Sequence, residues 1–221
     1  MKPEEKPYQQ KLRTINPAFL PTIEREIKKM LHAQIILPLR YSIWVANLVP
    51  IRRQNGEIRL CVDFRNLNKA SLKYNYPFPK MDQLLQIISG TQRLSMLDGF
   101  PGYNQVNVDT TDREKTTFTT PWGTFMYARM PFGLTNAGVT FQRAMDVAFM
   151  GQVNKFVVIY LNDITVFSKS DQKHLKHLMK VFDRGRKFGI SLNLKKSLFS
   201  VKEGKMLGHI ISKEGVVIDP K

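Results

Sequence analysis

The sequence predicts an α+β fold in which an antiparallel sheet is backed by helices. Apolar residues alternate with period two in several short runs, and tight-turn residues join some of these runs into hairpins. Other stretches repeat apolar residues at helical spacing and lie between strands that are not hairpin neighbours. This order of elements is typical of helices packed on an antiparallel sheet. Because no internal repeat or Gly/Ser linker interrupts the chain, we expect one body with lobes.

The first predicted helix starts at Pro21. Ile23, Ile27, Met30 and Leu31 fall on one helical face, with charged residues between them. Because proline is tolerated in the first turn of a helix, we expect about fourteen helical residues from this point.

A β-hairpin is predicted next, with strands over 43–51 and 58–64 and a turn at Asn55-Gly56. Side chains alternate across a strand, so polar residues of the returning strand share one face. The hairpin is expected to present Arg59, Cys61, Asp63 and Arg65 on that face and Arg52 and Arg53 near the tip. Such a basic tip is suited to phosphate binding. An ordinary solvent-exposed hairpin face would explain the same basic residues equally well.

The middle of the chain continues with the same periodicities. Helices are expected over 81–89, where Gly90 ends the helix, and from about 136 to 150. A short strand is expected over 94–98 and a second hairpin over 156–168.

A basic amphipathic helix is predicted after this hairpin. Its apolar face is expected to consist of Leu175, Leu178, Met179 and Phe182, and Gly189 is expected to end it. Alternating apolar residues then predict two more strands, over 190–194 and 207–211.

The charge of the chain indicates a polyanionic partner. Thirty-four Lys and Arg residues against eighteen Asp and Glu give a formal net charge of +16. Nucleic acid is the first candidate for that partner. Basic residues are concentrated between positions 173 and 205, where a solvated helix face is the alternative explanation.

No membrane span or secretion signal is expected. The longest apolar stretch, near 156–161, has about six residues, whereas a span needs about twenty. The N-terminus is charged and lacks the apolar centre of a secretory signal. With Cys61 as the single cysteine, no intrachain disulfide can form, so a cytosolic or nuclear, intracellular protein is expected.

Two aspartates are candidates for metal chemistry. Asp98 ends a predicted strand, and Asp163 stands at the tip of the 156–168 hairpin. Carboxylates that meet at one sheet edge can hold Mg²⁺, and two such ions can activate a hydroxyl and stabilise a leaving pyrophosphate. Aspartate is also common at turns because its side chain bonds the local backbone.

The chain resembles the reverse transcriptase (RNA-directed DNA polymerase) of Ty3/gypsy-type LTR retrotransposons, with a flavour of plant elements. An ordered set of motifs across nearly the whole chain carries the resemblance: CVDFRNLNKAS, YPFPKMDQLL, MLDGFPGYNQV, EKTTFTTPWGTFMYARMPFGLTNAGVTFQRAM, VVIYLNDITVFSKS, HLKHL, FGISLNLKKSLF and LGHIIS. The resemblance implies a right-hand polymerase fold. Fingers are expected over 1–72 and 106–136, palm over 73–105 and 137–212, and the start of a truncated thumb over 213–221.

The resemblance also implies a reaction. The family extends a primer on an RNA or DNA template with dNTPs, using two Mg²⁺ ions, for which Mn²⁺ is an alternative. Asp98 matches the family's first metal-binding aspartate, and its Tyr-x-Asp-Asp box matches 160–163, where Asn162 replaces one catalytic carboxylate. Tyr103 matches the aromatic that lies near the incoming sugar and excludes a 2′-hydroxyl.

Other matched residues are expected to contact the nucleotide or the nucleic acid. The nucleotide-binding group comprises Arg59, Arg52 or Arg53, Tyr103, Phe132 and Gly133. The template and primer group comprises Asp63, Arg65, Tyr160, Leu207, Gly208 and His209, with a plain strand and an exposed histidine as the alternative for 207–209.

Asn162 leaves three interpretations open. The loss of one charge at about 4 Å is worth about 4 kcal/mol in a partly wet site, which corresponds to a rate loss of two or more decades. Pro101 adds a stiff residue between Asp98 and Tyr103. The domain is therefore an impaired polymerase, a catalytically dead domesticated domain that binds nucleic acid, or a protein-interaction subunit.

The family pattern continues past Pro220 into a thumb, a connection region and an RNase H domain, so poor processivity and a larger polyprotein or assembly are expected; the oligomeric state is left open. His174 and His177 are expected on a solvated helix face rather than at a metal. Cys61 lacks a base partner for catalysis, and no P-loop pattern is present.

Overall fold

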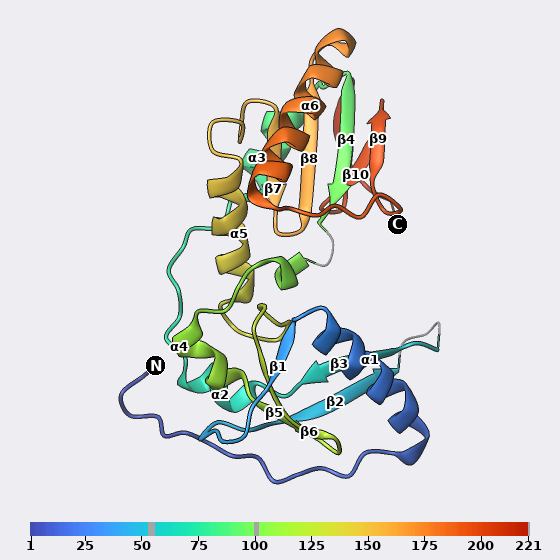
Figure 1. Ribbon diagram of the computed structural model, residues 1–221. Coiled ribbons are helices and arrows are strands. Elements are labelled where there is room, and N and C mark those ends of the chain that lie inside the picture. Colours follow the sequence, from blue (N-terminus) through green and yellow to red (C-terminus); the bar gives the residue numbers. More distant parts are fainter. Residues whose placement is uncertain (53–55, 100–101, 221) are drawn as a thin grey trace. The chain divides into compact units, whose positions relative to one another are not determined.

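The computed structural model of the protein describes residues 1–52, 56–99 and 102–220 (Figure 1). The chain divides into two compact units. Unit 1 comprises Met1–Tyr74 and Val106–Ala137, and unit 2 comprises Asn75–Gln105 and Gly138–Lys221. Over the described ranges, unit 1 has one sheet and unit 2 has two, and each unit has its own hydrophobic core. The assignment of fingers and palm to residue ranges stays a prediction.

Unit 1 contains a five-stranded sheet in the order β1-β6-β5-β2-β3. Strands β2 and β5 are parallel, and the other neighbours are antiparallel. The strands are β1 (Ile36–Pro38), β2 (Ala46–Arg52), β3 (Ile58–Val62), β5 (Phe118–Thr120) and β6 (Gly123–Tyr127). The first predicted hairpin is confirmed, because β2 and β3 pair from Leu48 opposite Val62 to Arg52 opposite Ile58. Asn55 of its predicted turn lies outside the described residues.

Unit 1 also contains five helical segments among its described residues. They are η1 (Pro17–Phe19), α1 (Leu20–His32), α2 (Arg65–Ala70), α4 (Thr110–Arg113) and η3 (Glu114–Thr116). Of these, α1 and α2 add buried residues to the core of the unit. Helix α1 buries Ile23 and Ile27, as helical spacing predicts. The ring of Phe118 contacts those of Phe125 and Tyr127, with centroids 6.0 and 5.3 Å apart.

Unit 2 contains a four-stranded sheet in the order β7-β8-β4-β9 and a three-stranded sheet in the order β10-β11-β12. The strands are β4 (Arg93–Asp98), β7 (Val157–Tyr160), β8 (Asp163–Ser168), β9 (Leu198–Val201), β10 (Gly204–Met206), β11 (His209–Ser212) and β12 (Gly215–Ile218). The second predicted hairpin is confirmed by antiparallel β7 and β8. Strand β12 pairs with β11 inside the segment where a thumb was expected to begin, and the name thumb stays a prediction.

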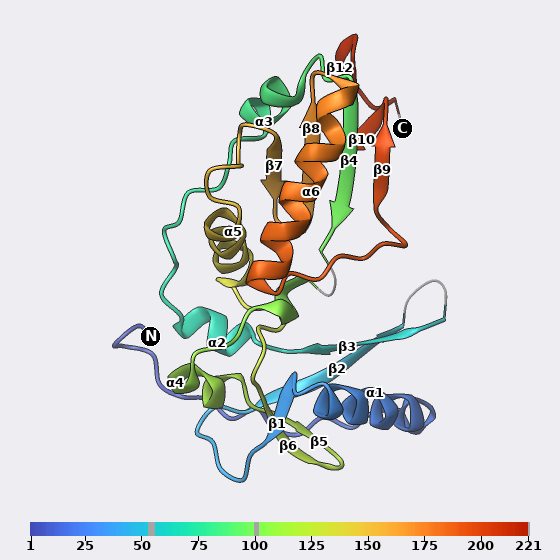
Figure 2. The same cartoon turned by 45° about the horizontal axis from the view of Figure 1, so that its top comes forward.

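Helices cover both faces of the four-stranded sheet. They are α3 (Met81–Ile88), α5 (Ala137–Ala148) and α6 (Asp171–Phe188), while the short η2 (Gly102–Gln105) follows the end of β4. Figure 2 shows α6 running along β8 and β4. Buried residues of α3 pack with Val158, Phe167 and residues of β10 and β11. Because both faces are covered, β7 and β8 are buried almost throughout.

The predicted orientation of α6 was only partly right, because Leu178 is buried as expected whereas two other residues of the predicted apolar face are not. The helix begins and ends where expected, and Gly189 caps it in the left-handed region at φ 66°. However, Leu175 and Met179 are 68% and 57% exposed, whereas His174 is 2% exposed. Two serines explain this rotation: Ser95 Oγ lies 2.8 Å from His174 Nε2, and Ser168 Oγ lies 2.9 Å from His174 Nδ1. A histidine with both ring nitrogens bonded can be buried, so the expectation of a solvated histidine face fails.

Two local predictions were also wrong, and helix α2 was not predicted. Residues 190–194 form no strand and make only an isolated bridge from Leu192 to Gly99, because a turn at 194–196 interrupts them. Strand β3 ends at Val62, so Asp63 and Arg65 are not part of it. Arg65 instead starts α2, a helix without a hydrophobic period long enough to reveal it. The overall α+β class is confirmed.

Candidate active site

The two candidate carboxylates lie at neighbouring strand ends in unit 2. Strands β4 and β8 are antiparallel, and their register ends with Asp98 opposite Asp163. Residues directly opposite in such a pair project to the same face, with Cα atoms about 4.5 to 5.5 Å apart. Strand register therefore brings together two carboxylates that are remote in sequence.

The Asp163 carboxyl group carries the electrostatic signature of this arrangement. Burial raises its pKa, and the negative charge of Asp98 raises it further. The residue as a whole is exposed, but the surrounding protein still removes part of the hydration of its carboxyl group. Because part of this rise comes from a second negative charge, a cation from solution would relieve the repulsion.

Backbone hydrogen bonds fix the end of β4. The Asp98 amide donates to Ser197 Oγ at 3.2 Å, and its carbonyl accepts from the Asn193 amide at 2.8 Å. One residue later, the Gly99 amide donates to the Asn162 carbonyl at 2.9 Å. The loop that carries Asn162 is thereby tied to the strand that carries Asp98.

The Asn162 side chain packs against Gly102. A Cβ atom at position 102 would lie 2.9 Å from Asn162 Nδ2, and Gly102 has φ +54°. Both observations require glycine there. Asn162 Oδ1 is buried and has no hydrogen-bond partner in the described part of the chain. Such an oxygen is costly to bury unless something else satisfies it.

These oxygens fit a divalent cation. Mg²⁺ takes hard oxygen ligands, often from one or two carboxylates, and keeps several waters. Asp98 and Asp163 supply two carboxylates on one face, and Asn162, which directly precedes Asp163, has an unsatisfied amide oxygen that is buried against Gly102. Over residues 1–52, 56–99 and 102–220, no cluster of three or more His, Cys, Asp or Glu side chains could hold a metal. The described acidic set is therefore a pair.

Tyr103 lies on η2, shortly after β4. Its ring meets that of Phe141 edge to face, with centroids 5.4 Å apart. Burial raises the pKa of its hydroxyl, so Tyr103 stays neutral at physiological pH. Gly138 lies beside it, where an added Cβ would be 3.6 Å from Tyr103 Oη and 3.5 Å from Leu161 Cδ2. Pro101 lies outside the described residues.

Candidate nucleotide-binding residues gather at the β3 strand of unit 1. The Arg59 guanidinium lies over the Phe132 ring, 4.7 Å from its centroid. Gly133 adopts φ +94°, and its carbonyl accepts from Asn68 Nδ2 at 2.7 Å. Arg52 is exposed at the end of β2, and Arg53 lies outside the described residues. Arg59 is exposed, so it can reach an anionic ligand.

Comparisons with known proteins decide the family. The family "Reverse transcriptase (RNA-dependent DNA polymerase)" matches residues 51–211. This chain belongs to the reverse transcriptase family. The domain is 34% identical over 202 residues to the retrovirus-related Pol polyprotein from transposon 297 of Drosophila melanogaster. It is 31% identical over 204 residues to that from the Drosophila transposon gypsy. The Ty3/gypsy identification is confirmed; its plant-like flavour stays a prediction.

The reverse transcriptase domain accounts for a small part of these relatives. The matches cover 90% of this chain and only 19% and 20% of the two Pol polyproteins. A solved structure of the foamy viral protease-reverse transcriptase in complex with RNA/DNA hybrid matches with a TM-score of 0.87 at 22% identity. That match covers 97% of this chain and 29% of the other, and it confirms the fold.

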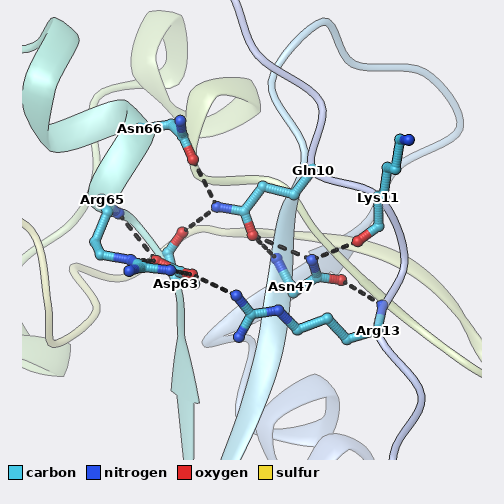
Figure 3. A network of polar contacts seen from close by, with 7 residues as sticks. All are labelled: Gln10, Lys11, Arg13, Asn47, Asp63, Arg65 and Asn66. Atoms are coloured by element: carbon cyan, nitrogen blue, oxygen red, sulfur yellow. Dashed lines mark hydrogen bonds and ion pairs between the residues drawn. The ribbon is translucent and has the colours of Figure 1, made fainter.

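In this reverse transcriptase domain, Asp63 is bound within a polar network (Figure 3). Its carboxylate accepts from Arg65 Nε at 2.8 Å and Arg65 Nη2 at 2.7 Å, and Arg13 lies 3.6 Å away. The hydrogen bond from Arg65 lowers the pKa of Asp63. Gln10 Nε2 bonds the Asp63 carbonyl at 2.9 Å, so the network ties the N-terminal segment to the end of β3. A template contact by Asp63 and Arg65 stays a prediction.

The remaining template and primer candidates of the reverse transcriptase domain lie in unit 2. Leu207 and Gly208 form the positive-φ turn between β10 and β11, so Leu207 is not in a strand. His209 is half-buried, and its Nδ1 lies 2.9 Å from the Leu207 carbonyl. Tyr160 packs against Phe78, with ring centroids 6.4 Å apart. The structure thus forms a hairpin at 207–209, and its primer role stays a prediction.

Sequence reasoning missed one residue of this site, Gln142 on α5. It is fully buried and bonds the loop between β7 and β8. A glutamine beside inward-facing apolar residues such as Phe141 was the available signal. Hydrophobic periodicity treats such a residue as solvent-facing, because only tertiary structure supplies its partners.

Proposed function

We propose that this reverse transcriptase domain binds divalent metal ions at Asp98 and Asp163 and extends a primer on an RNA or DNA template. The observation that carries the proposal is the register of β4 and β8, which sets the two carboxylates opposite each other. When bound, Mg²⁺ or Mn²⁺ supplies the positive charge that activates the primer hydroxyl and stabilises the leaving pyrophosphate.

The other candidate residues act by binding and orienting substrates. Arg59, exposed and stacked on Phe132, binds the phosphates of the incoming dNTP. Tyr103, neutral and braced by Phe141, lies beside the nucleotide sugar. The β10–β11 turn holds the primer end, and the Arg65 guanidinium contacts the template.

Asn162 lowers the activity in this proposal. It directly precedes Asp163 and has an unsatisfied amide oxygen, but it supplies no negative charge to a site that must hold dications beside a triphosphate. The lost charge interaction corresponds to a rate reduction of at least about 100-fold.

A second candidate function is nucleic-acid binding without catalysis. The +16 charge favours it, because a basic surface binds phosphates whether or not metals are held. In the described residues no third His, Cys, Asp or Glu joins the acidic pair to make a metal-binding cluster, which favours it as well. A pure protein-interaction scaffold is the third possibility, and the match to a small part of long Pol polyproteins fits a larger assembly in every case.

Primer extension on poly(rA)/oligo(dT) with Mg²⁺ or Mn²⁺ tests the proposal. We expect weak extension by the wild type and an increase of at least about 100-fold for Asn162→Asp, because the full charge is restored at an isosteric side chain. The double variant Asp98→Asn with Asn162→Asp is the matched control, since it has the same net charge as the wild type; it should stay inactive.

The outcomes separate the three functions. Extension by Asn162→Asp but not by the control supports the polymerase. An inactive Asn162→Asp that binds primer-template, with affinity falling steeply as salt increases, supports the binding function. If the protein does not bind primer-template even at low salt, only the protein-interaction function remains.

A further inference from the structure

The loop between β7 and β8 contains a strained residue. Strand pairing ends with Tyr160 opposite Asp163, so Leu161 and Asn162 form a two-residue loop. Leu161 has φ +54°, at a loop position where hairpins of this length usually carry glycine. A side chain in the left-handed region costs free energy, so its surroundings must hold it there.

Gln142 on α5 supplies that hold. Its Oε1 accepts from the Leu161 amide at 2.8 Å. Its Nε2 donates to the Ile159 carbonyl at 3.2 Å and to Asp146 Oδ1 at 3.1 Å. These partners fix the orientation of the amide, because the reverse orientation would set its oxygen against two acceptors. Gln142 is 0% exposed, so water cannot replace these bonds.

A second layer fixes Gln142 itself. Asp146, one helical turn later, accepts from Gln142 through Oδ1 and from the Tyr76 hydroxyl through Oδ2 at 2.6 Å. Bonds to an ionised acceptor are stronger than those between neutral groups. A continuous series of bonds therefore connects Tyr76, Asp146 and Gln142 to the loop.

The loop is held from two sides. Gln142 binds the Leu161 amide from α5, and the Gly99 amide binds the Asn162 carbonyl from the end of β4. The two anchors set the positions of Asn162 and Asp163 against Asp98. Ligands of Mg²⁺ must lie close to ideal positions, within about 0.5 Å, so a loosened loop weakens binding before it disturbs the fold.

We propose that Gln142, braced by Asp146 and Tyr76, is a positioning residue that fixes the β7–β8 loop and thereby sets the divalent-cation affinity of Asp98 and Asp163. The cation part rests on the proposed function, whereas the fixing of the loop does not.

Residue-resolved hydrogen exchange and Mn²⁺ titration by calorimetry test this on the full chain. In Gln142→Leu, we expect the Leu161 amide to exchange about tenfold faster relative to the β8 amides, the effect of one lost hydrogen bond. Mn²⁺ affinity should fall several-fold. Tyr76→Phe should also speed exchange of the Leu161 amide and lower the Mn²⁺ affinity, but by smaller factors.

Gln152→Leu is the matched control. Gln152 is a half-buried glutamine of the same unit, and its Nε2 donates to the Lys180 carbonyl at 3.3 Å, on α6 rather than on the loop. This variant should leave both Leu161 exchange and Mn²⁺ affinity unchanged.

If Gln142→Leu does not fold, a second test swaps the amide and the carboxylate between positions 142 and 146. In Gln142→Glu, two carboxylates face each other across the bond to Asp146, so Leu161 exchange should accelerate. In the double variant Gln142→Glu with Asp146→Asn, the amide at position 146 can again donate a hydrogen bond to the carboxylate at position 142. Exchange should then slow again, though not to the wild-type rate, because the Ile159 carbonyl still lacks its donor.

The outcomes are distinct. Unchanged Leu161 protection in folded variants at position 142 would overturn the inference. Uniformly faster exchange across unit 2 with unaltered Mn²⁺ affinity would also overturn it, since Gln142 would then be merely structural. If Leu161 protection depends on Gln142 but the wild type binds no Mn²⁺, the loop-fixing role is supported and the proposed metal site fails.

Discussion

Two aspartates at the ends of β-hairpins have opposite surroundings. Asp63, after β3 in unit 1, has a side chain that is 7% exposed and bonded to Arg65, so its pKa is lowered. Asp163, at the start of β8 in unit 2, faces Asp98, so its pKa is raised. The first carboxylate stabilises the fold, whereas the second is held at a cost in stability. A carboxylate that faces another carboxylate would be stabilised by a cation from solution.

The largest expected effect is on Asp63. Asp63→Asn should lower the free energy of unfolding by about 1 to 2 kcal/mol at pH 7; charged hydrogen bonds are lost, but the arginines are exposed and water screens them. Because the pKa of Asp63 is lowered by folding, the stabilisation is present above about pH 4 and lost as the pH falls through the lowered pKa. Urea unfolding from pH 3 to 7 measures this.

Asp112→Asn is the control for this prediction. Asp112 pairs with Lys115 at the surface, where its side chain is 57% exposed. Its substitution should change stability by less than about 0.5 kcal/mol. If both variants lose the same free energy of unfolding, the network around Asp63 stabilises the fold no more than a surface ion pair does.

A smaller effect of opposite sign is expected at Asp163. Asp163→Asn should stabilise the metal-free protein at pH 7 by less than about 1 kcal/mol, since solvent screens part of the repulsion. Because the pKa is raised by folding, the destabilising charge is absent below about pH 4 and develops as the pH rises through the folded pKa. The gain should therefore vanish in acid.

Unfolding of metal-free Asp163→Asn across the same pH range tests this sign. Asp183→Asn serves as control, because Asp183 pairs with Arg186 on the surface of α6 and both side chains are well exposed. A loss of stability in Asp163→Asn at pH 7 would remove the contrast between the two aspartates.

The smallest expected effect concerns Arg59, an exposed cation of unit 1 that is proposed to bind phosphate. Phe132→Leu removes the ring beneath Arg59, so the affinity for inorganic triphosphate should fall about twofold, or ~0.5 kcal/mol at an exposed site. Trp122→Leu changes another partly exposed aromatic of unit 1 and should have no effect. Calorimetric titration with triphosphate compares the two variants. If they bind triphosphate with equal affinity, Phe132 does not contribute to phosphate binding.

Local patterns predicted the hairpins because each carries its own signal. Ile58, Leu60 and Val62 alternate along β3, and Asn162-Asp163 interrupts two β-branched runs. The position of Asp98 opposite Asp163 needed more, since strand register between remote segments is not a local property. Family resemblance pointed to both residues, and the sheet brought them together.

The failures have a common physical origin. Leu175 and Met179 indicated a correct helix but lie on its exposed face, because the serines that satisfy His174 lie on β4 and β8. Gln142 was missed for the same reason, since its partners come from the β7–β8 loop. Hydrophobic spacing detects apolar burial, whereas burial of a polar side chain depends on partners supplied by other segments.

The contact between Asn162 and Gly102 has an evolutionary consequence. Asparagine and aspartate have nearly the same outline, so the glycine backbone that accommodates the amide would accommodate a carboxylate without rearrangement. Codons for the two residues differ by a single base. The backbone at Gly102 would therefore accept a carboxylate at position 162, and an exchange of asparagine for aspartate there would require one nucleotide substitution and no compensating change.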